Sequence, residues 1–289
     1  MQGYGSTERR IVEPMSARRD APIGMFDSGF GGLTVARAVI DLMPAEHMVY
    51  IGDTGRYPYG AKPAADVRRF ALELGRSLVH DFGAKAVVVA CNTAASVGLD
   101  ELTAVLPVPV IGVVEPGARA LVRATSSGRV GVIGTVGTIA SGAYDRAVAD
   151  TGASVSLVSA ACPGFVEFVE RDQTTGEEVT LLAQRLLAPV REAGVDALLL
   201  GCTHYPFLSA VIGEVMGSGV RVVSSADETA VAVRDALDGA GLLRDGAAGS
   251  HRFFSSGDVA RFAELGRRLL GPELEKAAAW PETGATRGE

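Results

Sequence analysis

Cysteine and histidine are scarce in this chain, which has three cysteines and four histidines among its 289 residues. No two cysteines have C-x-x-C spacing, and the histidines do not complete a zinc-ligand set, so neither a redox disulfide nor a metal site is expected. The chain also lacks an export signal, and in a reducing cytoplasm its cysteines are expected to be free thiols. No apolar run is long enough to span a bilayer, so we expect no membrane partner.

Positive charge is limited as well. The net charge is −7, and only three lysines are present, Lys62, Lys85 and Lys276. A nucleic-acid-binding surface needs clustered cations, so this charge balance argues against a nucleic-acid partner. With 47% hydrophobic residues, a chain of this length can bury one large core or two moderate ones. These properties fit a soluble cytoplasmic protein.

The two ends of the chain differ in composition from its middle. Residues 1–22 are polar and lack the apolar segment of a signal peptide, so we expect a disordered extension, with Met15 as an alternative start. Residues 273–289 are expected to form a flexible tail. The folded part is therefore expected between these segments.

Short apolar runs alternate with longer amphipathic stretches along the middle of the chain. Runs this short and this apolar are typical of strands covered on both faces. The eight expected strands are residues 23–26, 48–52, 86–90, 108–114, 129–134, 154–159, 197–201 and 220–225.

Helical periodicity fills the segments between these runs. Residues 66–82 have apolar side chains close to a 3.6-residue period, and residues 177–194 repeat the pattern, with Pro189 expected to interrupt it. Strands that alternate with such helices form βαβ units and a mostly parallel sheet. The predicted fold class is α/β.

The two halves of the chain resemble each other. "AVVVACNTAAS" ends an expected strand at Cys91, and "ALLLGCTHYPF" ends another at Cys202. "IGMFDSG" and "VGVIGTVG" open the corresponding halves. The repeated pattern predicts two pseudo-symmetric halves of four strands or more, each with a cysteine at the same place.

Polar residues follow the expected strands at the points where they end. Ligands of open α/β sheets bind outside these carboxyl ends, so the residues there are candidates for a binding site. They are Asp27 and Ser28 after the first strand, Asp53 after the second, Cys91, Asn92 and Thr93 after the third, and Cys202, Thr203 and His204 in the second half.

Either cysteine, taken alone, is more readily interpreted as a small buried core residue than as a reactive one. Two cysteines at matching points are harder to explain by packing, because facing halves would place the thiols on opposite sides of one cleft. Opposed thiols suit proton transfer at carbon, in which one removes a proton and the other returns one to the opposite face. A thiol is only a few per cent ionised near pH 7, so each needs a proton acceptor, Asp27 for Cys91 and His204 for Cys202.

No cofactor is expected. A Schiff-base lysine for pyridoxal phosphate would have to be Lys62, the only lysine near the proposed site. The glycine-rich "DSGFGG" lacks a Walker lysine and the full G-x-G-x-x-G pattern, so its N–H groups are more readily assigned to a carboxylate than to a nucleotide phosphate. Cys162 is interpreted as structural, and Glu170 either points into the cleft or is solvated on a helix.

Five segments together resemble the cofactor-independent glutamate racemases of bacteria: "IGMFDSGFGGLTV", "YIGDTGRYPYG", "VVACNTAAS", "GVVEPG" and "LLLGCTHYPFL". They occur in the family's order and extend over most of the chain between residues 23 and 240. The resemblance implies interconversion of L-glutamate and D-glutamate, which supplies the D-isomer for peptidoglycan, and a homodimer without a cofactor.

The resemblance also implies roles for individual residues. Cys91 and Cys202 would be the acid/base thiols, Asp27 and His204 their helpers, and Glu170 a further catalytic residue. The residues implied in substrate binding are Asp27, Ser28, Asp53, Tyr59, Gly60, Asn92, Thr93, Thr203 and His204.

The implied organisation is two α/β domains with the active site in the cleft between them. Residues 23–115 and about 226–270 would form the first domain, and residues 116–225 the second. Two other functions remain open: the same chemistry on aspartate or a hydantoin, and an amino-acid-binding protein that kept the cleft without catalysing proton exchange.

Overall fold

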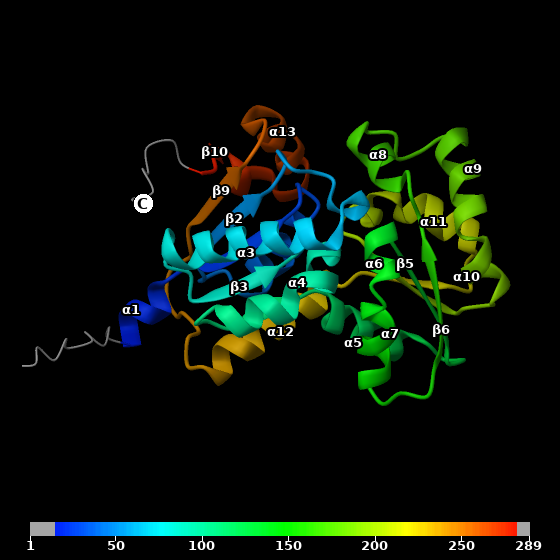
Figure 1. Cartoon of the computed structure of the whole chain (residues 1–289), viewed down its shortest axis with the longest axis horizontal. Helices are drawn as coiled ribbons and strands as arrows, with labels where there is room; N and C mark the ends of the chain where they lie inside the picture. Colours follow the sequence, from blue (N-terminus) through cyan, green and yellow to red (C-terminus); the bar gives the residue numbers. More distant parts are fainter. Residues whose placement is uncertain (1–14, 282–289) are drawn as a thin grey trace, which may run out of the picture.

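The computed structural model describes residues 15–281, which form two lobes side by side (Figure 1). Each lobe contains one β-sheet, and in both sheets every pair of neighbouring strands is parallel. Helices lie on the faces of the sheets. The predicted α/β class, with two mostly parallel sheets flanked by helices, is confirmed.

The first lobe has a six-stranded sheet of order β10-β9-β2-β1-β3-β4. Its strands are β1 (Ile23–Asp27), β2 (Met48–Gly52), β3 (Ala86–Val89), β4 (Val110–Gly112), β9 (His251–Ser255) and β10 (Ala278–Ala279). Its helices are α1 (Met15–Asp20), α2 (Leu33–Leu42), η1 (Tyr59–Ala61), α3 (Ala64–His80), α4 (Asn92–Val105), α12 (Ala226–Gly239), α13 (Val259–Leu270) and η3 (Gly271–Leu274).

The second lobe has a four-stranded sheet of order β6-β5-β7-β8. Its strands are β5 (Arg129–Gly134), β6 (Ser156–Ala161), β7 (Ala197–Gly201) and β8 (Arg221–Val223). Its helices are α5 (Val114–Ala124), α6 (Val136–Ala140), α7 (Ala143–Asp150), α8 (Phe165–Glu170), α9 (Glu177–Leu186), α10 (Ala188–Glu192), η2 (Tyr205–Leu208) and α11 (Ser209–Met216).

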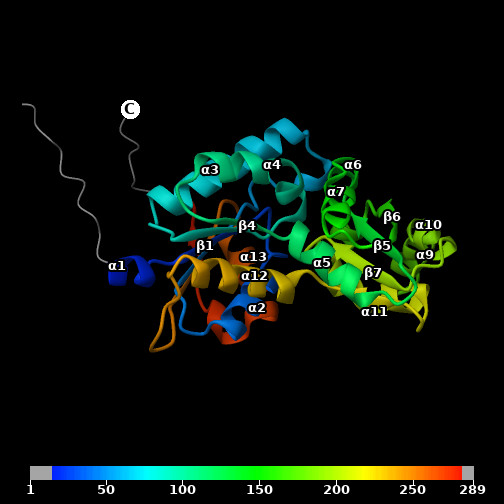
Figure 2. The ribbon, with the colours of Figure 1, turned by 90° about the horizontal axis from the view of Figure 1, so that it is seen from below.

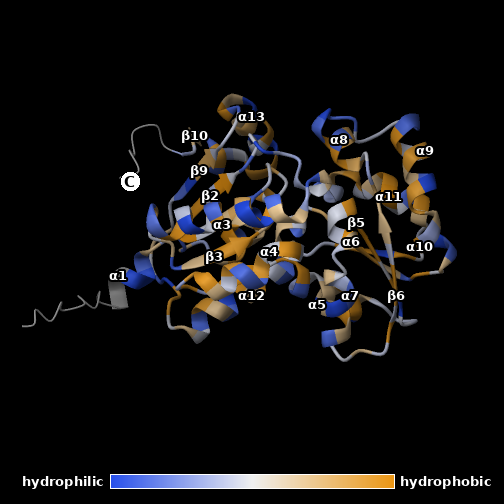
Figure 3. Cartoon of the chain, in the orientation of Figure 1, coloured by the Kyte–Doolittle hydropathy of each residue, from blue (hydrophilic) through white to orange (hydrophobic). Residues whose placement is uncertain are grey.

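The central strands are buried on both faces because their sequences are apolar without alternation. Every residue of β1, β2, β3 and β7 is buried. Figure 3 shows hydrophobic strands inside and hydrophilic residues on the outer helix surfaces. Helix α3 buries one face, with Val67, Phe70, Leu74 and Leu78 toward the sheet, as its periodicity predicts. The interruption expected near Pro189 is present, since α9 ends at Leu186 and α10 begins at Ala188.

The two sheets repeat one topology. Each half of the chain has four successive strands, β1 to β4 in the first half and β5 to β8 in the second. In both sheets these strands lie in the order second, first, third, fourth: β2-β1-β3-β4 and β6-β5-β7-β8. All eight expected strands are present, and Cys91 and Cys202 follow the third strand of their halves. The pseudo-symmetry read from the sequence is therefore present in the strand order.

The chain crosses from the first lobe to the second at α5 and returns at α12. Helix α12 packs against α2 in the first lobe and also against α5, so the two crossings lie together (Figure 2). Strand β9 then extends the first sheet beside β2. Among the described residues, no helix is both long and apolar enough to cross a membrane.

Both expected disordered ends are partly ordered. Residues 15–20 form α1, and the Pro22 carbonyl accepts a hydrogen bond from the Lys85 backbone N–H at 2.9 Å. At the other end, Trp280 is buried and its indole N–H donates to the Ser77 hydroxyl at 2.9 Å. The expectation of disorder was wrong for these stretches because local polarity does not reveal such distant partners, while residues 1–14 and 282–289 lie outside the described residues.

A buried ion pair holds the N-terminal end of the first sheet together. Lys85 Nζ lies 2.5 Å from Glu46 Oε2, and both side chains are only 2% exposed. The Lys85 ammonium also donates to the carbonyls of Arg19 and Leu242, and Glu46 accepts from the Arg244 backbone N–H. The pair therefore joins α1 and the segment before β9 to the sheet.

We predict that Glu46→Ala lowers the free energy of unfolding by about 3–5 kcal/mol, because it leaves the Lys85 ammonium buried without its counter-ion. Urea denaturation measures the change. Adding Lys85→Met to Glu46→Ala removes both charges and should recover most of the loss. Asp66→Ala, which breaks the exposed pair with Arg69, should cost less than about 1 kcal/mol. A Glu46→Ala protein as stable as Asp66→Ala would contradict the prediction.

Candidate active site

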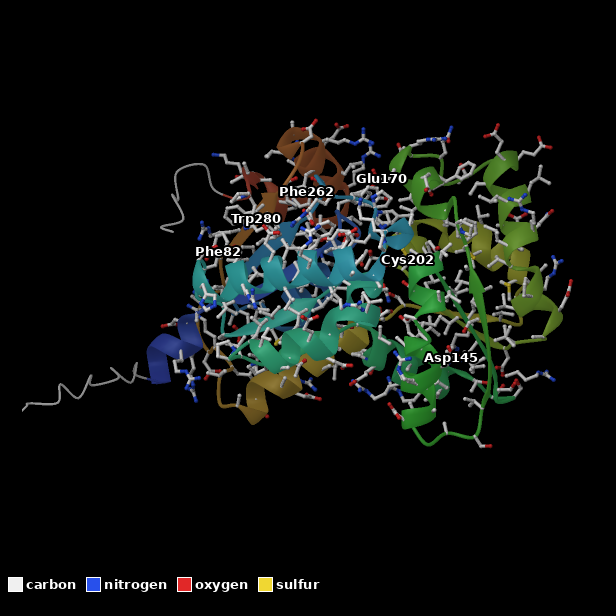
Figure 4. All side chains as sticks on the ribbon, in the orientation of Figure 1. Phe82, Asp145, Glu170, Cys202, Phe262 and Trp280 are labelled. Carbon is white, nitrogen blue, oxygen red and sulfur yellow. The ribbon has the colours of Figure 1, made fainter. Side chains whose placement is uncertain are left out.

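The two thiols lie at equivalent strand ends and line one cavity between the lobes. Cys91 follows β3 and is the N-cap residue of α4, and Cys202 directly follows β7. Figure 4 shows Cys202 at the junction of the two lobes. The parallel register brings the neighbouring strand ends together, since the Ala90 N–H donates to the Phe26 carbonyl and the Asp53 N–H donates to the Asp27 carbonyl.

Most of the expected site residues meet at this cavity. Those that line it are Ser28, Tyr59, Gly60, Cys91, Asn92, Thr93, Cys202, Thr203 and His204. Asp27, Asp53 and Glu170 do not line it and lie behind residues that do. None of the described lining residues is an arginine or a lysine. The cavity wall combines thiols, short polar side chains, tyrosines and apolar residues, with His204 and Glu167 as its titratable nitrogen and carboxyl groups.

Burial controls the ionisation of Cys91. Removal from solvent, together with the negative charge of Asp27, raises the pKa of the Cys91 thiol to about 12. Hydrogen bonding to the Ala94 and Ser28 backbone N–H groups, and to the Ser28 hydroxyl oxygen that accepts from the thiol at 3.6 Å, lowers the pKa by less. Cys91 lies at the N-terminus of α4, where the helix dipole favours a thiolate, but desolvation outweighs this effect.

Cys202 has the same balance of effects. Burial raises the pKa of its thiol, and the charges of Cys91 and Asp27 raise it further, while the His204 and Tyr205 backbone N–H groups lower it by less. Without a ligand, both thiols are therefore protonated at neutral pH, and either needs a neighbouring acceptor before it can remove a proton.

Asp27 lies completely buried behind Cys91. Its Oδ2 accepts hydrogen bonds from the backbone N–H groups of Gly29 and Gly32, at 3.2 and 3.0 Å. These N–H groups of "DSGFGG" were expected to hold a ligand carboxylate, and they bind the carboxylate of Asp27 instead. Asp27 Oδ1 is buried and has no hydrogen-bond partner among residues 15–281. One oxygen thus fixes the side chain and the other remains available to accept a proton.

His204 is held from behind by Glu170. The His204 Nε2 atom lies 3.4 Å from Glu170 Oε1, and the ring packs edge-on against Phe30 with centroids 4.9 Å apart. Glu170 is the last residue of α8 and lies beside α13 of the opposite lobe (Figure 4). Arg261 of α13 donates to the Glu170 carbonyl at 3.2 Å. Glu170 therefore contacts the cavity only through His204.

Asp53 is hydrogen-bonded to other side chains and not to the cavity. It is completely buried and accepts hydrogen bonds from the Arg56 guanidinium at 2.7 and 3.0 Å, from the Ser256 hydroxyl at 2.6 Å, and from the Tyr59 hydroxyl. Tyr59 lines the cavity and Asp53 does not. Its placement supports a role in holding Tyr59 rather than in touching a ligand.

A cluster of hydroxyl groups at another strand end was not predicted from the sequence. The hydroxyl oxygen of Thr93, in the first lobe, lies 3.0 Å from that of Thr135 and 3.2 Å from that of Thr138, both in the second lobe. The hydroxyl oxygens of Thr135 and Thr138 are 2.9 Å apart. Thr135 directly follows β5 and lines the cavity. Thr135 follows its strand as Cys91 and Cys202 follow theirs, so its position at a strand end is a sequence signal that predicts a site residue.

Other lining residues were not expected from the sequence. Tyr57 and Glu167 lie in the cavity wall, and so does Cys162, whose thiol had been interpreted as structural. Burial raises the pKa of the Cys162 thiol to about 12. Within residues 15–281, no group of three or more His, Cys, Asp or Glu side chains is arranged to hold a metal ion.

Comparison with known proteins identifies the family. A family model for Asp/Glu/hydantoin racemases matches residues 32–233. A glutamate racemase from Parafrankia sp. (strain EAN1pec) is 52% identical over 263 residues, which cover 90% of this chain and 95% of the relative. The chain belongs to the Asp/Glu/hydantoin racemase family. The prediction of an isomerase of the racemase class is thereby confirmed.

Solved structures of glutamate racemases share the fold of this family member. An isoform from Bacillus anthracis matches with a TM-score of 0.83 and 40% identity, covering 90% of this chain and 97% of that one. The Francisella tularensis enzyme, solved in complex with D-glutamate, matches with a TM-score of 0.83 and 30% identity over the same shares of the two chains. The two-lobed arrangement is therefore that of known racemases.

We predict that the native racemase shows no thiolate absorbance near 240 nm at pH 9, because burial raises the pKa of all three thiols. The same protein unfolded in guanidinium should show thiolate absorbance near its unperturbed pKa of about 8.5. The pH titration of absorbance checks both states. A native thiolate step below pH 8 would show that the thiols are stabilised as anions and that the prediction is wrong.

We predict that Glu170→Gln lowers kcat at least about tenfold, because the His204 ring loses the carboxylate that orients it. Steady-state racemase assays measure the change. Asp172→Asn is the matched control, since it breaks the ion pair of Asp172 with Arg268 of α13, at 2.8 Å, without touching His204. It should stay within about twofold of the wild type. Equal losses in the two variants would assign the effect to the link between lobes.

Proposed function

We propose that this racemase interconverts L-glutamate and D-glutamate through the Cys91 and Cys202 thiols. The observation that carries the proposal is that two thiols from equivalent strand ends of opposite lobes line one cavity. A substrate bound between them has one thiol on each face of its Cα atom. Such an arrangement suits inversion of a stereocentre.

The reaction is a pair of proton transfers. One thiol first gives its proton to its neighbour, Asp27 for Cys91 or His204 for Cys202, and becomes a thiolate. The thiolate removes the Cα proton, and the electron pair of the C–H bond stays on the substrate. The opposite thiol then delivers its proton to the other face of Cα and is left as a thiolate. That thiolate is reprotonated and the first acceptor gives up the proton it took, so both thiols are restored. No net proton is gained or lost, and the reverse direction uses the same groups with exchanged roles.

The cavity wall supports a doubly carboxylated amino acid as the substrate. Ser28, Asn92, Thr93 and Thr203 offer neutral hydrogen-bond donors for the carboxylates, with Tyr59 and Gly60 completing the wall. A grip without arginine or lysine leaves the substrate ammonium as the main positive charge beside Cα, where it stabilises the developing negative charge. Asp53 contributes through Tyr59, and Glu170 through His204.

Glutamate is favoured over aspartate or a hydantoin because the relatives that match over nine-tenths of this chain are glutamate racemases. The reaction as written requires no cofactor. We further propose that the protein acts as a homodimer in the cytoplasm, where free thiols persist, and that its product supplies D-glutamate for peptidoglycan.

We predict that the purified protein abolishes the circular dichroism of L-glutamate in D2O without added cofactor, with deuterium entering Cα. Cys91→Ser and Cys202→Ser should each lower kcat about 10²–10⁴-fold, because each removes one of the two proton carriers. Cys162→Ser is the matched third thiol, which the proton-transfer scheme does not use, and its effect should be far smaller.

Three outcomes distinguish the alternatives. Racemisation of aspartate but not glutamate would keep the mechanism and change the substrate. Binding of glutamate without Cα exchange would identify a binding protein. Equal activity in the wild type and the Cys91→Ser and Cys202→Ser variants would refute the two-thiol mechanism.

A further inference from the structure

Tyr144 contacts the backbone segments of both thiols, although it belongs to neither. It lies on α7 in the second lobe, and its side chain is buried. Its hydroxyl oxygen is 2.6 Å from Nδ2 of Asn92, the residue after Cys91 in the opposite lobe. Its ring lies against Gly201, the residue before Cys202. One side chain therefore spans the interface between the two thiol-bearing segments.

The contact with Gly201 is close enough to require a glycine. A Cβ atom added at Gly201 would lie 3.0 Å from Cε2 of Tyr144 and 2.8 Å from the Ile133 carbonyl oxygen. Any other residue would push the ring away from β7 and displace its hydroxyl from Asn92. The absence of a side chain at Gly201 thus leaves the space that the Tyr144 ring occupies.

The hydrogen bonds of Asn92 are incomplete without a ligand. Asn92 lines the cavity, and its Oδ1 is buried and has no partner among residues 15–281. An unpartnered buried amide atom costs free energy, which a ligand recovers by completing the hydrogen bond. Since Tyr144 bonds one end of the amide, it fixes the position and plane of the end that faces the cavity.

The Tyr144 hydroxyl can serve in either direction. Burial raises its pKa, so the phenol keeps its proton and both donates and accepts hydrogen bonds. It accepts from Nδ2 in the present orientation. After a half-turn of the amide it donates to Oδ1 instead, and both N–H hydrogens of Asn92 become available for a substrate carboxylate. A phenylalanine ring would have neither ability.

We propose that Tyr144 is a positioning residue of the racemase, which orients the Asn92 amide toward the substrate and fixes the Gly201–Cys202 segment opposite it. The inference rests on the proposed glutamate racemisation. It assigns Tyr144 no contact with the reacting atoms. Its effect is exerted on substrate binding through Asn92 and on the placement of the two thiols across the cavity.

The test is Tyr144→Phe, which removes the hydroxyl and keeps the ring against Gly201. We expect kcat/KM for glutamate to fall about ten- to 100-fold, with a raised KM, because the amide is no longer held. Two enantiomers have equal free energies, so the loss in kcat/KM must be the same for L-glutamate and D-glutamate.

A double-mutant cycle separates positioning from general destabilisation. If Tyr144 acts through Asn92, Asn92→Ala and Tyr144→Phe together should cost about as much as Asn92→Ala alone. Val148→Ala, at a buried position on the same helix, is the stability control. It should lower Tm and leave kcat/KM unchanged.

The outcomes distinguish this inference from the proposed function. Wild-type protein that does not racemise glutamate would refute the proposed function and the role of Tyr144 with it. If the wild type is active, a Tyr144→Phe enzyme within twofold of its kcat/KM would overturn the positioning role alone. So would losses for Tyr144→Phe and Asn92→Ala that simply multiply in the double variant.

Discussion

Burial of the two thiols in a shared cavity is the constraint on which the rest of this structure depends. Groups that exchange protons with one carbon atom must lie close to it on opposite faces, and water must be kept away from them. Two parallel sheets that present their strand ends to each other satisfy both requirements. The same burial raises the pKa of Cys91 and Cys202, so proximity is obtained at the expense of thiolate formation.

Residues around the cavity offset the raised pKa of the two thiols in the proposed mechanism. Asp27 is held by two glycine N–H groups and keeps one oxygen free, while Glu170 approaches the far nitrogen of His204. In the proposed mechanism Asp27 is the proton acceptor for Cys91, and His204, which Glu170 contacts from behind, is the acceptor for Cys202. Asp53 similarly holds Tyr59 by accepting a hydrogen bond from its hydroxyl, and Arg56 balances the charge of Asp53.

The lobes are connected on several sides of the cavity. The threonine hydroxyls at Thr93 and Thr135 meet on one wall, and Tyr144 meets Asn92 on another. Behind His204, Arg261 reaches across from α13 to the end of α8. Ring contacts join the lobes as well, since Phe30 of the first lobe packs edge-on against His204 and Phe207 of the second.

The sequence by itself determined the α/β class, the eight strands of the repeated halves and the two thiols. These features follow from local patterns, since an apolar run without alternation forms a buried strand and the polar residues after it fall at the sheet's carboxyl edge. Seven of the expected site residues line the cavity for this reason, and Tyr59 and Gly60, which the resemblance implied, line it too.

Only the tertiary structure decided which of the buried polar groups face the cavity and which hold other residues. Asp53 and Glu170 were grouped with the site, but Asp53 is bound by Arg56 and Glu170 acts from behind His204. The contacts of Tyr144 and Trp280 were not predicted from the sequence. Tyr144 bonds Asn92 and Trp280 bonds Ser77, and both partners lie far away along the chain. Hydrogen-bond partners are set by which elements meet in space, and local periodicity does not contain that information.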